Sequence, residues 1–405
     1  MEIQLAHYGQ LKFDEVQSEL IDTPEIQRLR GIKQLGLVST TYPDGVNTRY
    51  AHALGVSYTA GRIADQLKLD STEKRLVQLA GLLHDIGHTP FSHALEGLLS
   101  EDHAEFTKQL VVGAQKLNLP GAGRIHKILY KHGINPVTIG DLITAEYYAK
   151  PYLQQIVHGE VDADQMDYLE RDPYFTGNPL GKIDIDYLLG TMLIKDGRIC
   201  FEEKAVETLE SFFMARKKMY KTTYVHRVPR IAEAMLLKAV SLSLNDLPDL
   251  RSYTDDELFT RLMVQAMHPK SKELAERIKY RNLFKEAYKI NSKNASERDM
   301  QLAEKLGNAS TQNEMERLLL KEIGLKEGDI LLDVPIEALV GHRMTNTNIG
   351  ILLEDGSVTD LAVVYPPILE LAKEASADSL FSVYCAEEYK DKVREAVEKY
   401  LLQHK

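Results

Sequence analysis

The sequence predicts a mainly helical protein with a small α/β region at its C-terminal end. Apolar residues recur every three or four positions from about residue 18 to residue 240, which is typical of amphipathic helices. After residue 326 this spacing is replaced by short apolar runs bounded by turn residues. The 405 residues are 44% hydrophobic and 27% charged, so the composition is that of an ordinary folded chain. At roughly 150 residues per domain, this length suggests two or three domains.

Helix signals mark the first predicted elements along the chain. In residues 22–36, Asp22 or Thr23 can cap a helix. Pro24 suits the first turn of that helix and Gly36 suits its end. Further helices are predicted over residues 47–67, 71–85 and 204–224.

The C-terminal part of the chain has a different pattern. Residues 270–325 are rich in charge and are expected to be helical. Strands are predicted over residues 330–335, 349–364 and 380–386, with a turn at Asp355-Gly356, and a closing helix over residues 387–403. We therefore expect a first domain over residues 1–240, a helical extension over 241–325 and a small α/β region over 326–405.

The charge and cysteine content exclude several classes of protein. With 49 Lys and Arg against 60 Asp and Glu, the net charge is −11, so nucleic-acid binding is not indicated. The two cysteines, Cys200 and Cys385, form no CxxC pair, which excludes a disulfide framework and a thiolate zinc site as organising features. No apolar run is long enough to span a bilayer, and the first residues lack signal-peptide character. We expect a cytoplasmic protein.

One stretch, AGLLHDIGHTPFSHALE over residues 80–96, concentrates polar groups on otherwise apolar elements. His84 and Asp85 end an apolar helix, and Thr89-Pro90 can start another helix, with His88 and His93 close by. Burying a carboxylate and imidazoles costs several kcal/mol unless they are paired or bind a metal. A metal site explains this pattern better than core packing or helix capping.

Two other segments supply matching groups. Arg49 and His52 share a helical face at i and i+3. In residues 158–172, one helical face carries Asp164, Asp167, Tyr168 and Arg171 at i, i+3, i+4 and i+7. His52 and His84 would supply two imidazoles, and Asp85 and Asp164 two carboxylates. This ligand set suits a divalent metal ion, and Mn, Fe, Mg, Zn, Co and Ni all remain open.

These motifs together resemble the HD superfamily of metal-dependent phosphohydrolases, whose pattern is H…HD…D. The segments RYAHALGV, LLHDIGHTPFSHALE and VDADQMDYLERD are similar to the branch that contains the dNTP triphosphohydrolases. The resemblance covers roughly residues 18–240. It implies that residues 1–240 form a helical HD domain bundle and that the C-terminal α/β region is an appendage.

The resemblance implies a role for each matching residue. The implied metal ligands are His52, His84, Asp85 and Asp164. His93 matches a catalytic histidine that faces the α-phosphate, Glu96 its acidic partner, and His88 and His103 two further active-site histidines. The implied substrate contacts are Arg49, Lys204 and Arg216 for the phosphates, Tyr168 and Asp172 for the sugar 3′-hydroxyl, and Tyr224 for the sugar or base.

The resemblance also implies a second, activating nucleotide site. The matching residues are Asp22, Gln27, Arg28, Arg30 and Arg227. An amphipathic helix with a basic outer face explains the first four equally well. The chain has HYGQLKFDE where regulated relatives carry an Asp-Pro-x-His-Gly element, and Ala104 and Val225 also depart from the family pattern.

A purely structural role is an alternative explanation for several of these residues. His103 could lie on a wet helix face, Arg216 on a solvated basic face, and Tyr168 and Tyr224 in an amphipathic core. A lone His52 could be an ordinary hydrogen-bonded histidine, so its assignment depends on the other three ligand positions being filled.

The resemblance implies a metal-dependent phosphohydrolase that converts a dNTP to a deoxynucleoside and tripolyphosphate. Two alternatives stay open. One is an HD phosphohydrolase acting on nucleoside monophosphates, alarmones or another phosphate ester, and the other is a non-enzymatic nucleotide-binding regulator. The expected partners are a nucleotide and further copies of the chain, as a dimer or tetramer, and no membrane.

Overall fold

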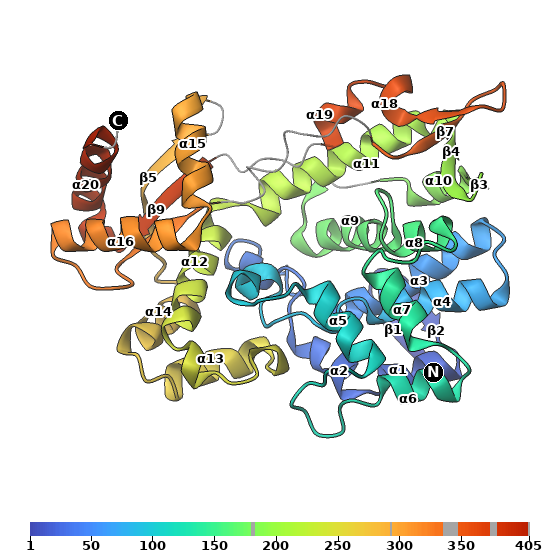
Figure 1. The fold of residues 1–405 in the computed structure, drawn as a ribbon, viewed down its shortest axis with the longest axis horizontal. Helices are drawn as coiled ribbons and strands as arrows, with labels where there is room; N and C mark the ends of the chain where they lie inside the picture. Colours follow the sequence, from blue (N-terminus) through green and yellow to red (C-terminus); the bar gives the residue numbers. More distant parts are fainter. Residues whose placement is uncertain (180–182, 292–293, 335–346, 373–378, 404–405) are drawn as a thin grey trace.

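The computed structural model describes residues 1–405 except 180–182, 292–293, 335–346, 373–378 and 404–405. Helices dominate these residues, and the sheets are small, so the predicted mainly helical class is confirmed (Figure 1). The helices of the N-terminal bundle are α1 (Glu15–Ile21), α2 (Pro24–Arg28), α3 (Arg49–Gln66), α4 (Ser71–Leu83), α5 (His103–Val112), α6 (Ile125–Lys131), α7 (Pro136–Ile143), α8 (Pro151–Val157) and α9 (Ala163–Thr176). The later helices are α10 (Ile185–Gly190), α11 (Val206–Met219), α12 (Arg227–Leu242), α13 (Asp255–Val264), α14 (Pro269–Lys279), α15 (Glu297–Leu306), α16 (Ala309–Ile323), α18 (Leu361–Val364), α19 (Ile368–Ala372) and α20 (Lys390–Gln403).

Side-chain caps mark the starts of α3, α4 and α9, the three helices that carry the candidate site described in the next subsection. The Thr48 side chain accepts a hydrogen bond from Ala51 N at the start of α3. Asp70 accepts from the first amides of α4, and Asp162 accepts from Gln165 N at the start of α9. Helix α3 packs between α4 and α9, and the apolar faces of all three lie in the main core. The bundle therefore holds one end of each helix in a defined place.

Strands in the described residues form three sheets. Strands β1 (Glu2–Leu5) and β2 (Gly9–Lys12) form an antiparallel hairpin, which the sequence analysis did not predict. The second sheet has the order β3 (Met192–Lys195), β4 (Arg198–Glu202), β7 (Gly350–Leu352), β8 (Val358–Asp360), with β4 and β7 parallel. The third sheet is antiparallel, in the order β5 (Lys285–Asn291), β9 (Ser379–Cys385), β6 (Ile330–Asp333).

Several predicted boundaries need correction. The helix expected over residues 22–36 ends at Arg28, and a 3-10 turn over Leu29–Gly31 follows it. Thr89-Pro90 begins no helix, because the chain turns there and a 3-10 helix, η3, starts at His93 (His93–Leu98). The helix expected over residues 204–224 is divided into a 3-10 turn, η5 (Glu203–Ala205), then α11 and a π-helical turn over Tyr220–Tyr224.

The C-terminal part also differs from expectation in places. Strand β5 lies in the stretch that was expected to be helical. It is extended because it pairs with β9, a strand that lies far away in the sequence. Leu361–Val364 is helical rather than extended. Pro335, the end of one predicted strand, lies outside the described residues.

The domain boundaries predicted at residues 240/241 and 325/326 remain a prediction. A helix runs through the first boundary, and a sheet joins residues from both sides of the second. Helix α12 runs through the first boundary. Strand β7 pairs with β4, so residues beyond 326 complete a sheet that begins near residue 192. Figure 1 shows the C-terminal residues at two places, with α18 and α19 beside α11, and α20 at the far end near α16.

Among the described residues, no helix combines the length and apolar character needed to cross a bilayer.

Candidate active site

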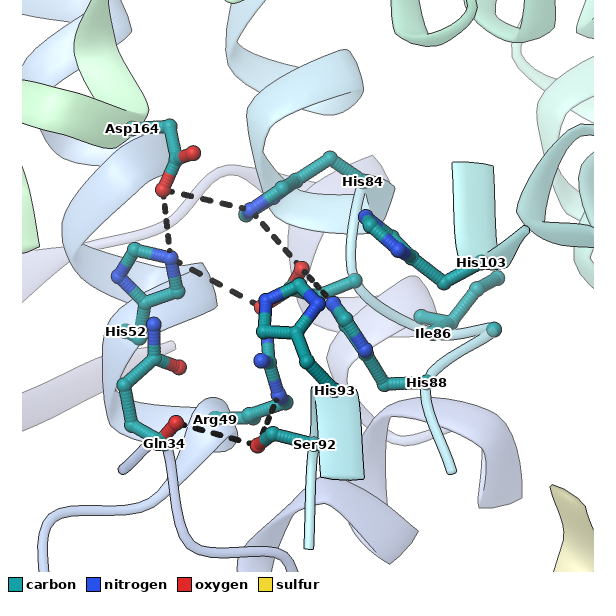
Figure 2. A network of polar contacts seen from close by, with 12 residues as sticks. Gln34, Arg49, His52, His84, Ile86, His88, Ser92, His93, His103 and Asp164 are labelled. Atoms are coloured by element: carbon teal, nitrogen blue, oxygen red, sulfur yellow. Dashed lines mark hydrogen bonds and ion pairs between the residues drawn. The ribbon is translucent and has the colours of Figure 1, made fainter. Parts of the chain in front are cut away.

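Three helix ends bring the predicted metal ligands together. His52 lies in the first turn of α3, His84 caps the C-terminal end of α4, and Asp164 lies in the first turn of α9. Asp85 follows His84 directly. Figure 2 shows the side chains of His52, His84 and Asp164 pointing toward one another from separate elements.

The distances between these groups are those of a ligand set for one ion. His52 Nε2 lies 2.9 Å from Asp164 Oδ1 and 3.8 Å from Asp85 Oδ2. His84 Nε2 lies 3.2 Å from Asp85 Oδ1 and 3.8 Å from Asp164 Oδ1. His52, His84 and Asp164 thus offer ligand atoms within 4.8 Å of one another. Two imidazole nitrogens and carboxylate oxygens at this spacing match the donors that divalent transition metals accept.

The hydrogen bonds behind the two histidines orient them for metal binding. His84 Nδ1 lies 2.8 Å from the Gly81 carbonyl oxygen, and buried His84 Nε2 has no hydrogen-bond partner among the described residues. His52 Nδ1 lies 2.7 Å from Asp167 Oδ2, and Arg171 bonds Asp167 in turn. Acceptors at Nδ1 leave each Nε2 as the metal-facing nitrogen. The residues present therefore fit a divalent metal ion.

Electrostatics within the ligand set follow from burial and close pairing. Burial opposes the charge on His52, but its hydrogen bonds to Asp164 and Asp167 outweigh burial and raise the His52 pKa to about 10. Burial likewise opposes ionisation of Asp85, yet Arg49 and the neighbouring histidines hold the pKa of its carboxyl well below the ordinary value. The ligand carboxylate of Asp85 is thus ready in its charged form.

Arg49 lies against the metal ligands rather than apart from them. Its Nη1 donates to Asp85 Oδ2 at 2.5 Å and its Nε donates to Ser92 Oγ at 2.7 Å. The side chain is 2% exposed. A guanidinium in this position supplies fixed positive charge at the edge of the ligand set.

A second polar cluster adjoins the first through Asp85. His88 Nε2 lies 3.2 Å from Asp85 Oδ1. Glu96 is the centre of the cluster, with Oε1 at 2.7 Å from His103 Nδ1 and Oε2 at 3.1 Å from His93 Nδ1. The rings of His88 and His103 stack with centroids 3.8 Å apart. The structure therefore brings together all four residues predicted as catalytic: His88, His93, Glu96 and His103.

The four residues differ in exposure and in charge. The His93 side chain is 64% exposed, whereas His88 is buried. Burial, Arg49 and His103 together lower the pKa of His88, which favours a neutral ring. Burial opposes the charge of Glu96, but hydrogen bonds from His103 and His93 outweigh it and lower the Glu96 pKa. The accessible imidazole is therefore paired with an ionised carboxylate.

The residues expected to contact the nucleoside also meet. Tyr224 donates its hydroxyl to Asp172 Oδ2 at 2.9 Å, and Asn47 Nδ2 donates to Asp172 Oδ1 at 3.1 Å. The rings of Tyr168 and Tyr224 lie edge to face, 6.3 Å apart. Burial raises the pKa of Asp172 to about 6 despite these hydrogen bonds. Tyr168 and Asp172 share α9 with Asp164, so they lie about one turn and about two turns from this predicted metal ligand.

The two expected phosphate contacts beyond Arg49 lie in different surroundings. Arg216, on α11, lines a pocket of about 340 Å³ together with Gln165, His158 and Arg198. Gln165 follows the metal ligand Asp164, so this pocket adjoins the first turn of α9. Lys204 lies on η5, its side chain 58% exposed, and its ammonium pairs with Glu202.

The structure sets Arg28 apart from the other residues predicted for an activating site. Arg30 Nε donates to Gln27 Oε1 at 2.8 Å, and its guanidinium lies over the Tyr50 ring. Arg28, two residues earlier, points to the opposite side and is 6% exposed. Residues two apart on a helix face different directions, so these two arginines cannot share one surface. Asp22 is exposed after α1, and Arg227 is exposed at the start of α12.

Sequence reasoning missed other residues that border the site. Asn47 binds Asp172, and Asp167 orients His52. Gln34 has a buried Oε1 without a hydrogen-bond partner among the described residues, and its backbone carbonyl oxygen accepts from Ser92 Oγ at 3.1 Å (Figure 2). The sequence analysis places Asp167 on the same helix face as Asp164 but gives it no role. Asn47 and Gln34 lie in an irregular segment, whose spacing carries no such signal.

Comparison with known proteins identifies the family. Residues 49–172 match the family described as HD domain, and residues 183–405 match the family described as HD associated region. The second match covers more than half of the chain, and the first contains all four predicted metal ligands. The chain therefore belongs to the HD-domain superfamily of metal-dependent phosphohydrolases.

The chain is also similar to individual proteins over most of its length. It is 34% identical to an uncharacterized protein of Methanocaldococcus jannaschii over 67% of this chain and 56% of that protein. It is 26% identical to the human deoxynucleoside triphosphate triphosphohydrolase SAMHD1 over 93% of this chain and 69% of that protein. A crystal structure of a hypothetical protein from Aquifex aeolicus superposes with a TM-score of 0.74 and 27% identity, covering 98% of this chain and 99% of that one. The chain spans about half the length of the curated relatives with the highest identity.

Proposed function

We propose that this chain hydrolyses deoxynucleoside triphosphates to a deoxynucleoside and tripolyphosphate, using one bound divalent metal ion. The observation that carries the proposal is the adjacency of two clusters at Asp85. Asp85 Oδ1 lies 3.2 Å from the metal-ligand nitrogen His84 Nε2 and 3.2 Å from His88 Nε2 in the histidine cluster. A phosphate held at the metal ligands would thus lie beside preplaced imidazoles, the arrangement that phosphoryl transfer requires.

The metal ligands in this proposal are His52, His84, Asp85 and Asp164. When bound, a divalent ion polarises a phosphoryl oxygen and makes a bound water more acidic. Arg49 adds positive charge beside Asp85 without a proton to lose. Arg216 and Lys204 would meet the outer phosphates from α11 and η5.

The histidine cluster would manage the protons. Glu96 accepts from the Nδ1 atoms of His93 and His103, which leaves each Nε2 to exchange a proton with substrate or water. His93 is the most accessible of the three histidines and would act on the leaving oxygen. The buried, neutral His88 would donate a hydrogen bond without adding charge.

Two features support a deoxynucleoside triphosphate as the substrate. Asp172, Tyr168 and Tyr224 form a polar and aromatic group on α9 and the turn after α11, suited to a sugar hydroxyl and a ring. The human relative and its Dictyostelium discoideum homologue, which is 29% identical over 69% of this chain, are both named deoxynucleoside triphosphate triphosphohydrolases.

A product assay tests the proposal. The full chain would be incubated with Mn²⁺ or Mg²⁺ and each dNTP, singly and in mixture, and products separated by ion exchange. We expect deoxynucleoside and tripolyphosphate. Since a metal supplies several kcal/mol of transition-state stabilisation, His84→Ala and Asp85→Ala should lower the rate by roughly a thousandfold or more. His132→Ala, which removes a histidine paired with Glu19 outside the site, should not.

Other products would replace the proposal. Release of pyrophosphate or orthophosphate, or turnover of monophosphates or alarmones alone, would keep the metal site and change the substrate. Nucleotide binding without hydrolysis in the metal-loaded protein would favour a regulator. Activity confined to mixtures would support an activating site near Asp22, Gln27, Arg30 and Arg227, with Arg28 excluded by its burial.

We also propose that the chain forms a dimer or tetramer in the cytoplasm. Both cysteines are free and buried, in keeping with a reducing compartment. Sedimentation of the full chain would give the number of copies.

A further inference from the structure

The segment that joins the two clusters has an unusual backbone. Phe91 and Ser92 have φ of 58° and 60°, two consecutive non-glycine residues in the left-handed region immediately before His93. Residues other than glycine rarely adopt a positive φ, because their Cβ atom crowds the backbone. Such a turn persists only where surrounding groups hold it. The position of His93 therefore depends on whatever restrains Phe91 and Ser92.

One restraint comes from Asp255, the first residue of α13. Its Oδ1 accepts from Phe91 N at 2.7 Å, and its Oδ2 accepts from Lys33 N at 3.0 Å. Lys33 Nζ pairs with the same carboxylate at 3.4 Å. Ser92 Oγ donates to the Lys33 carbonyl oxygen at 2.7 Å and receives Arg49 Nε. Asp255 is 1% exposed, so these amides have no solvent to replace it.

A second restraint comes from Arg251, four residues earlier. Arg251 Nη1 donates to the Gly87 carbonyl oxygen at 2.8 Å, and Nη2 donates to the Glu101 carbonyl oxygen at 2.6 Å. It therefore ties the segment before His88 to the segment before His103. Arg251 is 8% exposed.

Arg28 completes this arrangement from the other side. Its Nη2 donates to the carbonyl oxygens of Ile86 and His88 at 3.0 and 2.8 Å, and its Nη1 to that of Tyr253 at 3.0 Å. Three consecutive carbonyl groups, from Ile86 to His88, are thus held by two buried guanidinium groups. The same Arg28 also fastens the segment that carries Arg251 and Asp255.

These contacts join two separately recognised parts of the chain. Residues 86–103 lie in the HD domain, whereas residues 251–255 lie in the HD associated region. The site residues themselves all come from other segments, so no residue of 251–255 adds a ligand or an acid. What this segment contributes is the shape of the loop between the metal ligands and His93.

We propose that residues 251–255 of the associated region are a positioning element, which holds the loop of residues 86–93 so that His88 and His93 face the metal ligands. The proposal uses the phosphohydrolase assignment but does not depend on which phosphate ester is hydrolysed. Arg251 and Asp255 act through the backbone of Gly87 and Phe91. Arg28 acts together with this element, because it bonds both the loop and Tyr253, and we therefore do not assign it to a nucleotide site.

Hydrogen exchange on the full, metal-loaded chain tests the proposal without substrate. Asp255→Ala removes the acceptor of Phe91 N–H, so peptides covering residues 86–93 should exchange faster, while peptides of α3 and α9 should not change. Asp255→Asn keeps one oxygen acceptor and should give a smaller change. Asp333→Ala is the matched control, since Asp333 is a partly buried acidic partner of Arg230 and Tyr384 in the same region, with its side chain 11% exposed, and none of its hydrogen bonds reaches the loop.

Kinetics provide the second readout. Misplacing catalytic groups by about 1 Å costs on the order of a hundredfold, so Asp255→Ala should lower kcat by roughly tenfold to a hundredfold at unchanged metal content. KM should change less, because the metal ligands and the Asp172 group stay in place. Asp255→Asn should fall between Asp255→Ala and the unchanged chain, and Asp333→Ala should retain kcat.

Three results would overturn the positioning role. One is unchanged exchange of residues 86–93 in Asp255→Ala. Another is an equal rise across the whole HD domain, which would mean general destabilisation. The third is an equal loss of kcat in Asp333→Ala. If the unchanged protein hydrolyses no dNTP, the proposed substrate fails, and the exchange result alone decides the positioning role.

Discussion

Asp172 shows how burial at one residue can make substrate binding depend on pH. Its carboxyl is 2% exposed and accepts from Tyr224 and Asn47, and burial raises its pKa to about 6. The ionised form accepts hydrogen bonds more strongly than the neutral acid. A sugar hydroxyl at this position would therefore bind better as the pH rises through 6.

We predict that kcat/KM for a dNTP rises as the pH increases through about 6, and that Asp172→Asn removes this part of the profile. The variant should also lose roughly tenfold to a hundredfold in kcat/KM, the equivalent of about 1.5–3 kcal/mol for a hydrogen bond to a charged group. Initial rates between pH 5 and pH 8 measure both effects. An unchanged profile in the variant would remove Asp172 from the binding group.

The raised pKa of Asp172 also predicts how the stability of the folded chain changes with pH, which provides an independent check. The folded pKa of Asp172 lies above the ordinary 3.8, so the folded state holds this proton more tightly than the unfolded state. The contribution of Asp172 to stability is therefore greatest below about pH 4 and falls as the pH rises to about 6. Asp172→Asn should gain stability relative to the unchanged chain between pH 4 and pH 7.

At the scale of elements, the site requires α3 and α9 to approach closely. His52 on α3 meets Asp167 on α9 at 2.7 Å, and Asp167 is fully buried. Gly55, one turn after His52, makes this approach possible. A Cβ on Gly55 would lie 1.9 Å from Asp167 Oδ1 and 2.4 Å from Arg171 Nη2. The glycine thus makes room for the carboxylate that orients a metal ligand.

We predict that Gly55→Ala destabilises the protein by about 1–3 kcal/mol, as overpacking does, and weakens metal binding. Gly61→Ala is the matched control on the same helix, because its Cβ would meet only the movable end of Gln78. That substitution should be close to neutral, since alanine favours a helix interior over glycine by roughly 0.5–1 kcal/mol. Denaturant unfolding and calorimetric metal titration compare the two. Equal effects would contradict the role given to Gly55.

At the scale of the whole molecule, the predicted metal ligands lie at the ends of three helices, or in the turn after α4, and only the folded chain brings them together. An ion bound to this set stabilises the folded state, because the unfolded chain offers no such site. The gain is about 2.7 kcal/mol when the free ion is at about 100 times its Kd.

We predict that a chelator lowers the Tm of the full chain and abolishes hydrolysis, and that added Mn²⁺ restores both. In His84→Ala, added metal should change the Tm little, because the site then lacks one of the ligands of the ion. Thermal unfolding with and without chelator measures this. An equal Tm under both conditions in the unchanged chain would show that no metal binds these residues.

Helical periodicity predicted the helical class of the N-terminal bundle and the positions of α3 and α4, because an amphipathic stripe is a local property of the sequence. The helices predicted over residues 47–67 and 71–85 agree with α3 and α4 to within two residues at each end. Strand β5 could not be predicted in this way, because its partner β9 is almost a hundred residues away and its own sequence, KEAYKIN, is charged and half-exposed. The pairing of β4 with β7 was hidden for the same reason.

The sequence by itself determined the chemistry of the site: which imidazoles and carboxylates are present, and which of them share a helix face. Those facts follow from residue type and from a spacing of three or four. Tertiary structure decided the partners between distant segments: Asp167 of His52, Glu96 of His103, and Asp255 of the Phe91 amide. It also decided the direction of Arg28, which sequence alone left on a surface. The physical reason is that a contact between distant segments depends on how whole elements pack, and local periodicity does not record that packing.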